Sequence, residues 1–181
     1  LGGAIANDVH GKNHHKLGTF GRFVKEVGIC RSDKGYLVCS REENIDLFKA
    51  TIGGLGLTGV IEWATIKLQK INSNQLNTTS QRFNCLEDFF KLSSELDDAN
   101  EFSVSWIDCT ASGASLGRGV YTGGNFSNYG SLVANKQKYY SLPFLPKRSL
   151  INKKSLKIFN SVYWRRAPSK KVMKLMNYDS F

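Results

Sequence analysis

The chain begins with Leu1-Gly-Gly-Ala-Ile-Ala-Asn-Asp-Val-His-Gly-Lys-Asn-His-His15, and the interpretation of the rest depends on this stretch. Gly2 and Gly3 lack a Cβ, so their backbone can pass close to a ligand and bind it through main-chain N–H groups. Polar and titratable residues follow at a density too high for a buried core. The stretch is therefore expected in a cleft or on a surface.

Three histidines in this stretch raise the question of a metal site. Imidazoles four residues apart on a helix can share one ion, as His10 and His14 would. Gly11 and Gly18 disfavour a helix there, and the four cysteines lie far away in the sequence. No metal is therefore expected, and His14 and His15 are interpreted as a solvated, structural pair.

A family signal lies in Gly2-Gly-Ala-Ile-Ala-x-Asp-x-His10-Gly-Lys-Asn-His-His15, followed by Gly18-Thr-Phe-Gly21. This pattern resembles the FAD-binding (PCMH-type) domain of the vanillyl-alcohol oxidase/p-cresol methylhydroxylase superfamily. Within it, the chain is most similar to the decaprenylphosphoryl-β-D-ribose 2′-oxidase-like proteins. Gly-Gly followed by His-Gly also occurs in sugar-lactone oxidases, whereas the longer His-Gly-Lys-Asn-His-His string is more specific.

The resemblance implies FAD as the cofactor and oxidation of a secondary alcohol of a sugar. The expected substrate is a polyprenyl-phosphate-linked pentose, in a 2′-epimerisation that a partner reductase would complete. An aldonolactone oxidase acting on a soluble sugar lactone is the alternative enzyme. By the same resemblance, the chain is an internal piece of a longer enzyme. Alone it would bind FAD weakly and be inactive.

The resemblance also implies which residues contact the flavin. His10 and Lys12 would line the interface between flavin and substrate, and Trp106 would face the active site or serve as an ordinary core aromatic. The family's pyrophosphate arm, active-site cysteine and late lysine lie outside the chain, so no complete catalytic set is expected within it. The expected cofactor contacts are Gly2, Gly3, Asn7, Asp8, Val9, His10, Asn13, Gly59, Val60 and Ile61.

The stretch Gly54-Leu-Gly-Leu-Thr-Gly59 fits the dinucleotide pattern Gly-x-Gly-x-x-Gly. That motif needs a strand before it and a helix after it, with an acid about 20 residues further on. Here a helix pattern precedes, residues 60–68 alternate like a strand, and the acid is missing. A Rossmann site is therefore rejected. A glycine turn that enters a core strand would explain the same residues without a ligand.

Several further elements follow from patterning. Two apolar runs around the turn Ser32-Asp-Lys-Gly35 predict a β-hairpin. Residues 44–52 predict a short helix capped by the Asn44 side chain. Helical spacing appears at 86–96 and 154–166, and strand alternation at 102–108 and 117–123. In the helix at 154–166, the apolar residues expected on one face are Leu156, Phe159, Val162 and Tyr163.

The polar, turn-rich residues 71–80 predict a domain boundary at their start. The expected fold is α+β: residues 1–71 form the later part of a two-subdomain PCMH-type FAD-binding domain. Residues 72–181 form the first part of an α+β substrate domain with an antiparallel sheet. Cys30, Cys39, Cys85 and Cys109 form no Cys-x-x-Cys pair and are expected to be free thiols.

The net charge of +10 is concentrated at the C-terminal end, where residues 135–181 hold twelve Lys and Arg against Asp179 alone. A lipid-linked substrate suggests that residues 136–174 contact an anionic membrane surface, with Leu142-Pro-Phe-Leu-Pro146 as an apolar tip. The enzyme would then be cytoplasmic or peripheral on a membrane. A solvated basic face remains open, whereas a nucleic-acid-binding module leaves residues 1–70 unexplained and is not expected.

Overall fold

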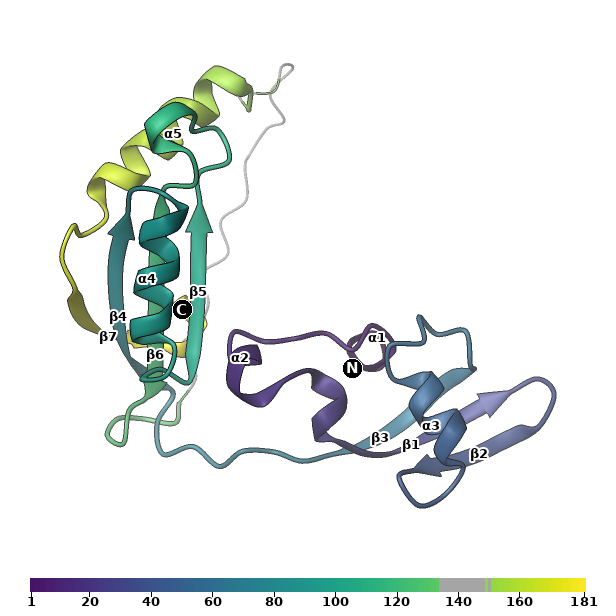
Figure 1. Ribbon diagram of the computed structural model, residues 1–181. Helices are drawn as coiled ribbons and strands as arrows, with labels where there is room; N and C mark the ends of the chain where they lie inside the picture. The colour runs from purple at the N-terminus through teal and green to yellow at the C-terminus, as the bar shows by residue number, and fades with distance from the viewer. Residues whose placement is uncertain (134–148, 150) are drawn as a thin grey trace. The chain divides into compact units, whose positions relative to one another are not determined.

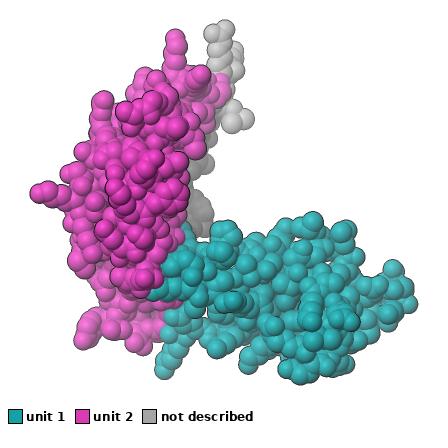
Figure 2. All heavy atoms as spheres, in the orientation of Figure 1, with its two compact units in different colours: residues 1–70 teal, residues 71–181 magenta. Residues whose placement is uncertain are grey.

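The computed structural model describes residues 1–133, 149 and 151–181. The chain divides into two compact units, residues 1–70 and 71–181 (Figure 2). Each unit combines helices with an antiparallel sheet, and each has its own apolar core. The division falls one residue from the boundary that the polar composition predicts between residues 71 and 72.

The first unit is built on a three-stranded antiparallel sheet in the order β2-β1-β3 (Figure 1). β1 (Val24–Arg31) and β2 (Gly35–Ser40) form the expected hairpin, with Arg31 opposite Gly35. β3 (Val60–Ile66) pairs with the other side of β1 and lies at the sheet edge. The strand predicted after the glycine turn is therefore confirmed, and it ends two residues earlier than expected.

Short helices cover this sheet. They are α1 (Gly2–Ala6), α2 (His14–Leu17), the 3-10 helix η1 (Phe20–Phe23) and α3 (Ile45–Thr51). Ile5 of α1 and Phe48 of α3 are almost fully buried and pack with apolar residues of β1 and β2. Because burial of one such side chain contributes about 1.5–3 kcal/mol, these two contacts fix both helices on the sheet.

The predicted side-chain cap of α3 by Asn44 is wrong. Asn44 does occupy the position before the helix, but its side chain makes no bond to the helix amides. Its Nδ2 instead donates to the Val38 carbonyl at 2.8 Å. With φ at +47°, Asn44 adopts the left-handed conformation that Asn tolerates better than most residues. It therefore works as a turn residue that ties the helix start to β2.

The second unit is built on a four-stranded antiparallel sheet in the order β5-β6-β4-β7. Its strands are β4 (Gln75–Phe83), β5 (Phe102–Ile107), β6 (Gly119–Phe126) and β7 (Val172–Asn177). The turn-rich interpretation of residues 71–80 is wrong from Gln75 onward, because β4 is an inner strand there with Leu76 and Thr78 buried. β5 and β6 are confirmed, whereas β7 lacks a clear sequence signal.

Helix α4 (Leu86–Leu96) lies along the sheet (Figure 1), as its spacing predicts. Its Leu92 and Leu96 pack with Phe83 of β4 and Tyr121 of β6 to form the core of the second unit. Two 3-10 turns complete the described part, η2 (Gly113–Ser115) and η3 (Tyr178–Ser180).

Helix α5 (Lys153–Arg166) confirms the second predicted helix of this unit. Its start is fixed by a capping box, in which Asn152 accepts bonds from the amides of Lys154 and Ser155. Its apolar residues remain largely exposed, although amphipathic spacing suggests a buried face. The predicted apolar tip at 142–146 lies outside the described residues, as does most of 136–150.

Candidate functional site

The structure brings the two expected flavin-contact regions of the first unit together. A methyl group placed on Gly2 would lie 3.9 Å from Cβ of Ile61, so α1 runs against β3. A methyl group on Gly3 would meet no atom within 4 Å. Because Gly2 and Gly3 begin α1, their amides have no carbonyl within the helix to bond. Both glycines therefore present accessible backbone next to an edge strand.

The side chains of Asn7 and Asp8 have structural partners within the unit. Asn7 Nδ2 donates to the Gly3 carbonyl at 2.8 Å at the end of α1. Asp8, at a φ of +43°, accepts the amide hydrogen of Gly21 at 2.8 Å. Gly21 has no space for a Cβ, since that atom would lie 2.4 Å from Ile52 Cγ2. These residues hold the loop that carries the remaining candidates.

That loop places Val9, His10, Lys12 and Asn13 at or near the surface. His10 forms an isolated β-bridge with Thr19, and its ring centroid lies 4.9 Å from that of His14. Asn13 precedes α2 without capping it through its side chain. Within the described parts of the chain, no three His, Cys, Asp or Glu residues are grouped to hold a metal.

The glycine turn before β3 is fixed by a cation. Arg31 donates from Nη1 to the Thr58 carbonyl at 2.9 Å, and Asp33 holds the same guanidinium at 2.8 Å. Gly59 has a φ of +145°, and a Cβ on it would lie 2.7 Å from the Cys30 carbonyl oxygen. Val60 next to it is 69% exposed. The turn and the hairpin line an open depression of about 380 Å³.

These features fit one wall of a flavin site. The wall offers accessible glycine backbone, an exposed apolar side chain at Val60 and an edge strand that a planar ring system can approach. The glycine at position 3 is the clearest sign, because nothing in the unit occupies the space in front of it. The contacts themselves stay predictions for all ten expected residues.

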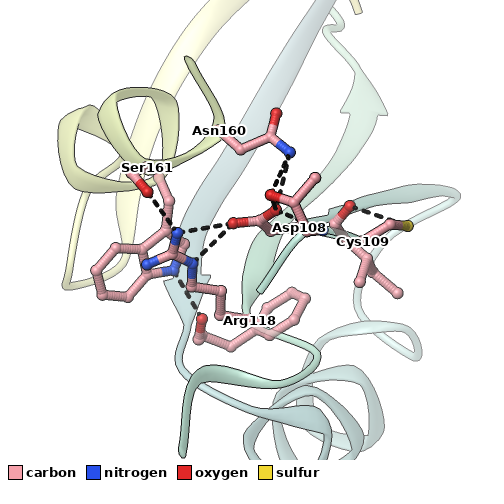
Figure 3. Close-up of polar contacts among 9 residues, drawn as sticks. Asp108, Cys109, Arg118, Asn160 and Ser161 are labelled. Atoms are coloured by element: carbon pink, nitrogen blue, oxygen red, sulfur yellow. Dashed lines mark hydrogen bonds and ion pairs between the residues drawn. The ribbon is translucent and has the colours of Figure 1, made fainter. Parts of the chain in front are cut away.

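The second unit contains a buried polar cluster that sequence patterning did not identify (Figure 3). Asp108 is 1% exposed and follows β5, while Arg118 precedes β6. Oδ2 of Asp108 accepts two bonds from Arg118, from Nε at 3.0 Å and Nη2 at 2.7 Å. Oδ1 accepts the Thr110 amide and hydroxyl and Nδ2 of Asn160. Arg118 also donates to Ser161.

These bonds decide the charge state of Asp108. Burial alone raises the pKa of its carboxyl, but the bonds from Thr110, Arg118 and Asn160 outweigh burial and lower the pKa to about 2. The carboxylate is therefore ionised throughout the neutral range. A carboxylate with a pKa this low is a poor proton acceptor, so the cluster holds structure and is no candidate for a general base.

Aromatic residues of α5 extend the cluster. Trp164 lies beside Arg82 and Arg118, with guanidinium carbons 4.4 and 5.0 Å from the ring centroid, and donates to the Phe83 carbonyl at 2.9 Å. Tyr163 contacts Trp106 edge to face, with centroids 4.7 Å apart. Trp106, a candidate pocket residue, is therefore positioned by α5. It belongs to the second unit, whereas His10 and Lys12 belong to the first.

No model of a known protein family matches the chain. Curated proteins similar to it include the following two. An uncharacterized protein from the mprA 5′ region of Streptomyces coelicolor is 38% identical over 120 residues, which covers 66% of this chain and 32% of that protein. The decaprenylphosphoryl-beta-D-ribose oxidase of Mycolicibacterium smegmatis is 28% identical over 179 residues, which covers 92% of this chain and 39% of the oxidase.

The matched part of the chain therefore covers 32% and 39% of the length of these relatives. The similarity to the mycobacterial protein supports a relationship to an oxidase.

Proposed function

We propose that this chain belongs to an FAD-dependent oxidoreductase that oxidises a secondary alcohol of a polyprenyl-phosphate-linked pentose. The observation that carries the proposal is similarity over 92% of the chain to a protein named as a decaprenylphosphoryl-ribose oxidase. The contact between Gly2 and Ile61 supports it, because it places two separated glycine-rich segments where one ligand can touch both.

FAD would supply the acceptor for the hydride that leaves the carbinol carbon. The backbone of Gly2 and Gly3 would bind and orient the flavin from one side, because the space in front of Gly3 is open. Gly59 would add main-chain contacts from the turn before β3. His10 and Lys12, both at the surface of the first unit, would orient sugar hydroxyls by hydrogen bonding. Trp106 is the candidate substrate contact within the second unit.

The cofactor proposal is tested with Gly3→Leu in the intact protein. Leucine is a good helix former and replaces glycine in α1, where a Cβ meets no atom, so the melting temperature should not fall. The new side chain would block the ligand surface, and a misfit of about 1–3 kcal/mol weakens FAD binding about fivefold to 150-fold. Flavin absorbance and FAD titration measure this.

The substrate is tested by anaerobic flavin bleaching with two compounds. A polyprenyl-phosphate pentose should bleach the flavin, and an aldonolactone should not. Bleaching by the lactone alone would point to the soluble-lactone oxidase instead. An intact protein that takes up no FAD, or an unchanged FAD affinity in Gly3→Leu, would contradict the proposed site.

A further inference from the structure

Helix α5 is attached to its unit by polar groups. Asn160 donates to Asp108, Ser161 accepts from Arg118, and the Trp164 indole donates to the Phe83 carbonyl. At 100° per residue, these three positions share one side of the helix. Together with the edge-to-face contact of Tyr163 with Trp106, these hydrogen bonds hold α5 on its unit. An ordinary amphipathic helix instead buries an apolar face on the core.

The opposite side of α5 is apolar and exposed. Ile158 is 67% exposed, Phe159 is 62% exposed and Val162 is 43% exposed. The helical spacing places all three away from Asn160 and Trp164. Within the described part of the chain, α5 has no buried residue at all. We call Ile158, Phe159 and Val162 the outward face of α5.

Cations flank the outward face. At 100° per residue, Lys154, Arg165 and Arg166 lie on its half of α5, and all three side chains are exposed. The sequence from 151 to 178 contains no Asp or Glu. Another exposed aromatic gives a contrast: Phe90 on α4 is 65% exposed, but Glu87, Asp88 and Glu95 share its helix. Only the face on α5 combines apolar exposure with uniform positive charge among these two helices.

We propose that the outward face of α5 docks on the surface of an anionic lipid bilayer. Apolar side chains on a short interfacial helix enter the boundary between headgroups and acyl chains, while Lys and Arg remain with the headgroups. Each cation near an anionic leaflet strengthens binding about fivefold. The hydrogen bonds to Asp108 and Phe83 hold the opposite side of the helix, so the outward face is exposed without local unfolding.

This inference goes beyond the proposed oxidation, because it concerns a surface and not the flavin. No helix among the described residues is long and apolar enough to cross a membrane. With 14 residues, α5 is shorter than the about 20 that a spanning helix needs, so it would lie on the bilayer surface. A peripheral contact of this kind depends on salt, because exposed charges are screened over about 10 Å at 0.1 M ionic strength.

The test is co-sedimentation of the intact protein with vesicles. One set contains phosphatidylcholine with phosphatidylglycerol, and the other contains phosphatidylcholine alone. We expect binding to the anionic set at low salt, with little binding to the neutral set or at high salt. The double variant I158S/F159S should bind about tenfold or more weakly, and K154S/R165S about thirtyfold more weakly.

The matched controls are Phe90→Ser and Lys91→Ser on α4, which should leave vesicle binding unchanged. FAD content and melting temperature are measured for every variant, so a loss of folding or of flavin is separated from a loss of docking. If I158S/F159S is unstable, K154S/R165S still tests the face, because both side chains are exposed.

Two results would overturn the proposal. One is a protein that ignores anionic vesicles at low salt. The other is unchanged vesicle binding in both α5 variants. If I158S/F159S instead lowers the mass found by light scattering, the face binds a second copy of the chain and not lipid.

Discussion

Replacing Asp108 by Asn should destabilise the second unit more than any other single change to a charged residue described above. Asp108 accepts five hydrogen bonds, two from Thr110, two from Arg118 and one from Asn160. Asparagine keeps the shape but presents an NH₂ group to one set of these donors. It also leaves the Arg118 guanidinium, whose side chain is 13% exposed, without its counter-charge.

The size of the effect follows from two estimates. Removing one partner of a buried ion pair costs about 3–5 kcal/mol, because the other charge is left uncompensated. The pKa of Asp108 is lowered from 3.8 to about 2, which at 1.36 kcal/mol per unit corresponds to about 2.5 kcal/mol of folding free energy. We expect a loss of about 3 kcal/mol in the free energy of opening this unit.

The lowered pKa of Asp108 also determines how the stability of the second unit changes with pH. A carboxyl whose pKa is lower in the folded state stabilises the fold fully above its unfolded pKa, near 4. This contribution is lost as the pH falls toward the folded pKa of about 2. The Asp108→Asn protein should therefore lose less stability than the native protein between pH 5 and pH 2.

Native-state hydrogen exchange of the segment 153–166 measures the opening free energy in the intact protein. Asp33→Asn is the matched control, because Asp33 also pairs with an arginine but is 52% exposed, and surface pairs contribute about 0–1 kcal/mol. The reasoning is refuted if protection from hydrogen exchange falls by the same amount in both variants, in the second unit for Asp108→Asn and in the first unit for Asp33→Asn. Unchanged exchange at 153–166 in Asp108→Asn would refute it as well.

Two other changes test the packing of each unit. Gly21→Ala should destabilise the first unit by about 1–3 kcal/mol, because the new methyl group would lie 2.4 Å from Ile52 Cγ2 and 2.9 Å from Asp8 Oδ1. Thermal unfolding measures this loss of stability, and an unchanged melting temperature would contradict the close packing. Trp164→Phe should lower the free energy of opening the second unit by about 1–2 kcal/mol, since it removes the hydrogen bond to the Phe83 carbonyl and weakens the contacts with Arg82 and Arg118. Amide hydrogen exchange at residues 153–166 should become faster, while exchange at residues 24–40 should not change.

Local patterns predicted the local structure well. Helix α4 has the bounds that its apolar spacing indicates, and the hairpin forms around Ser32-Asp-Lys. The errors lie where distant residues decide. Gln75 to Ser80 look like a linker in sequence, but β6 and β7 pair with them from both sides and make them an inner strand. No window of neighbouring residues contains that information.

The candidate site shows the same limit. The glycines at 2, 3 and 59 were found from sequence because they match a family pattern, and their proximity depends on the packing of α1 against β3. The partnership of Asp108 with Arg118 and Asn160 was missed. Its three members lie 10 and 52 residues apart, and nothing in their spacing marks a bond. The sequence contains one weak sign of the cluster, because Asp108 is the only acid between residues 102 and 118 and lies two residues after Trp106.

The pairing of β4 with β7 has a consequence for synthesis on the ribosome. The first unit draws its sheet from residues 24–66 and can fold soon after they emerge, whereas β4 waits for a partner that begins about 90 residues later. At about 5–20 residues per second, one edge of β4 remains unpaired for roughly 5–20 s. During that interval the nascent chain offers an open strand to chaperones and to neighbouring copies, so slower translation between codons 84 and 171 should increase aggregation rather than relieve it.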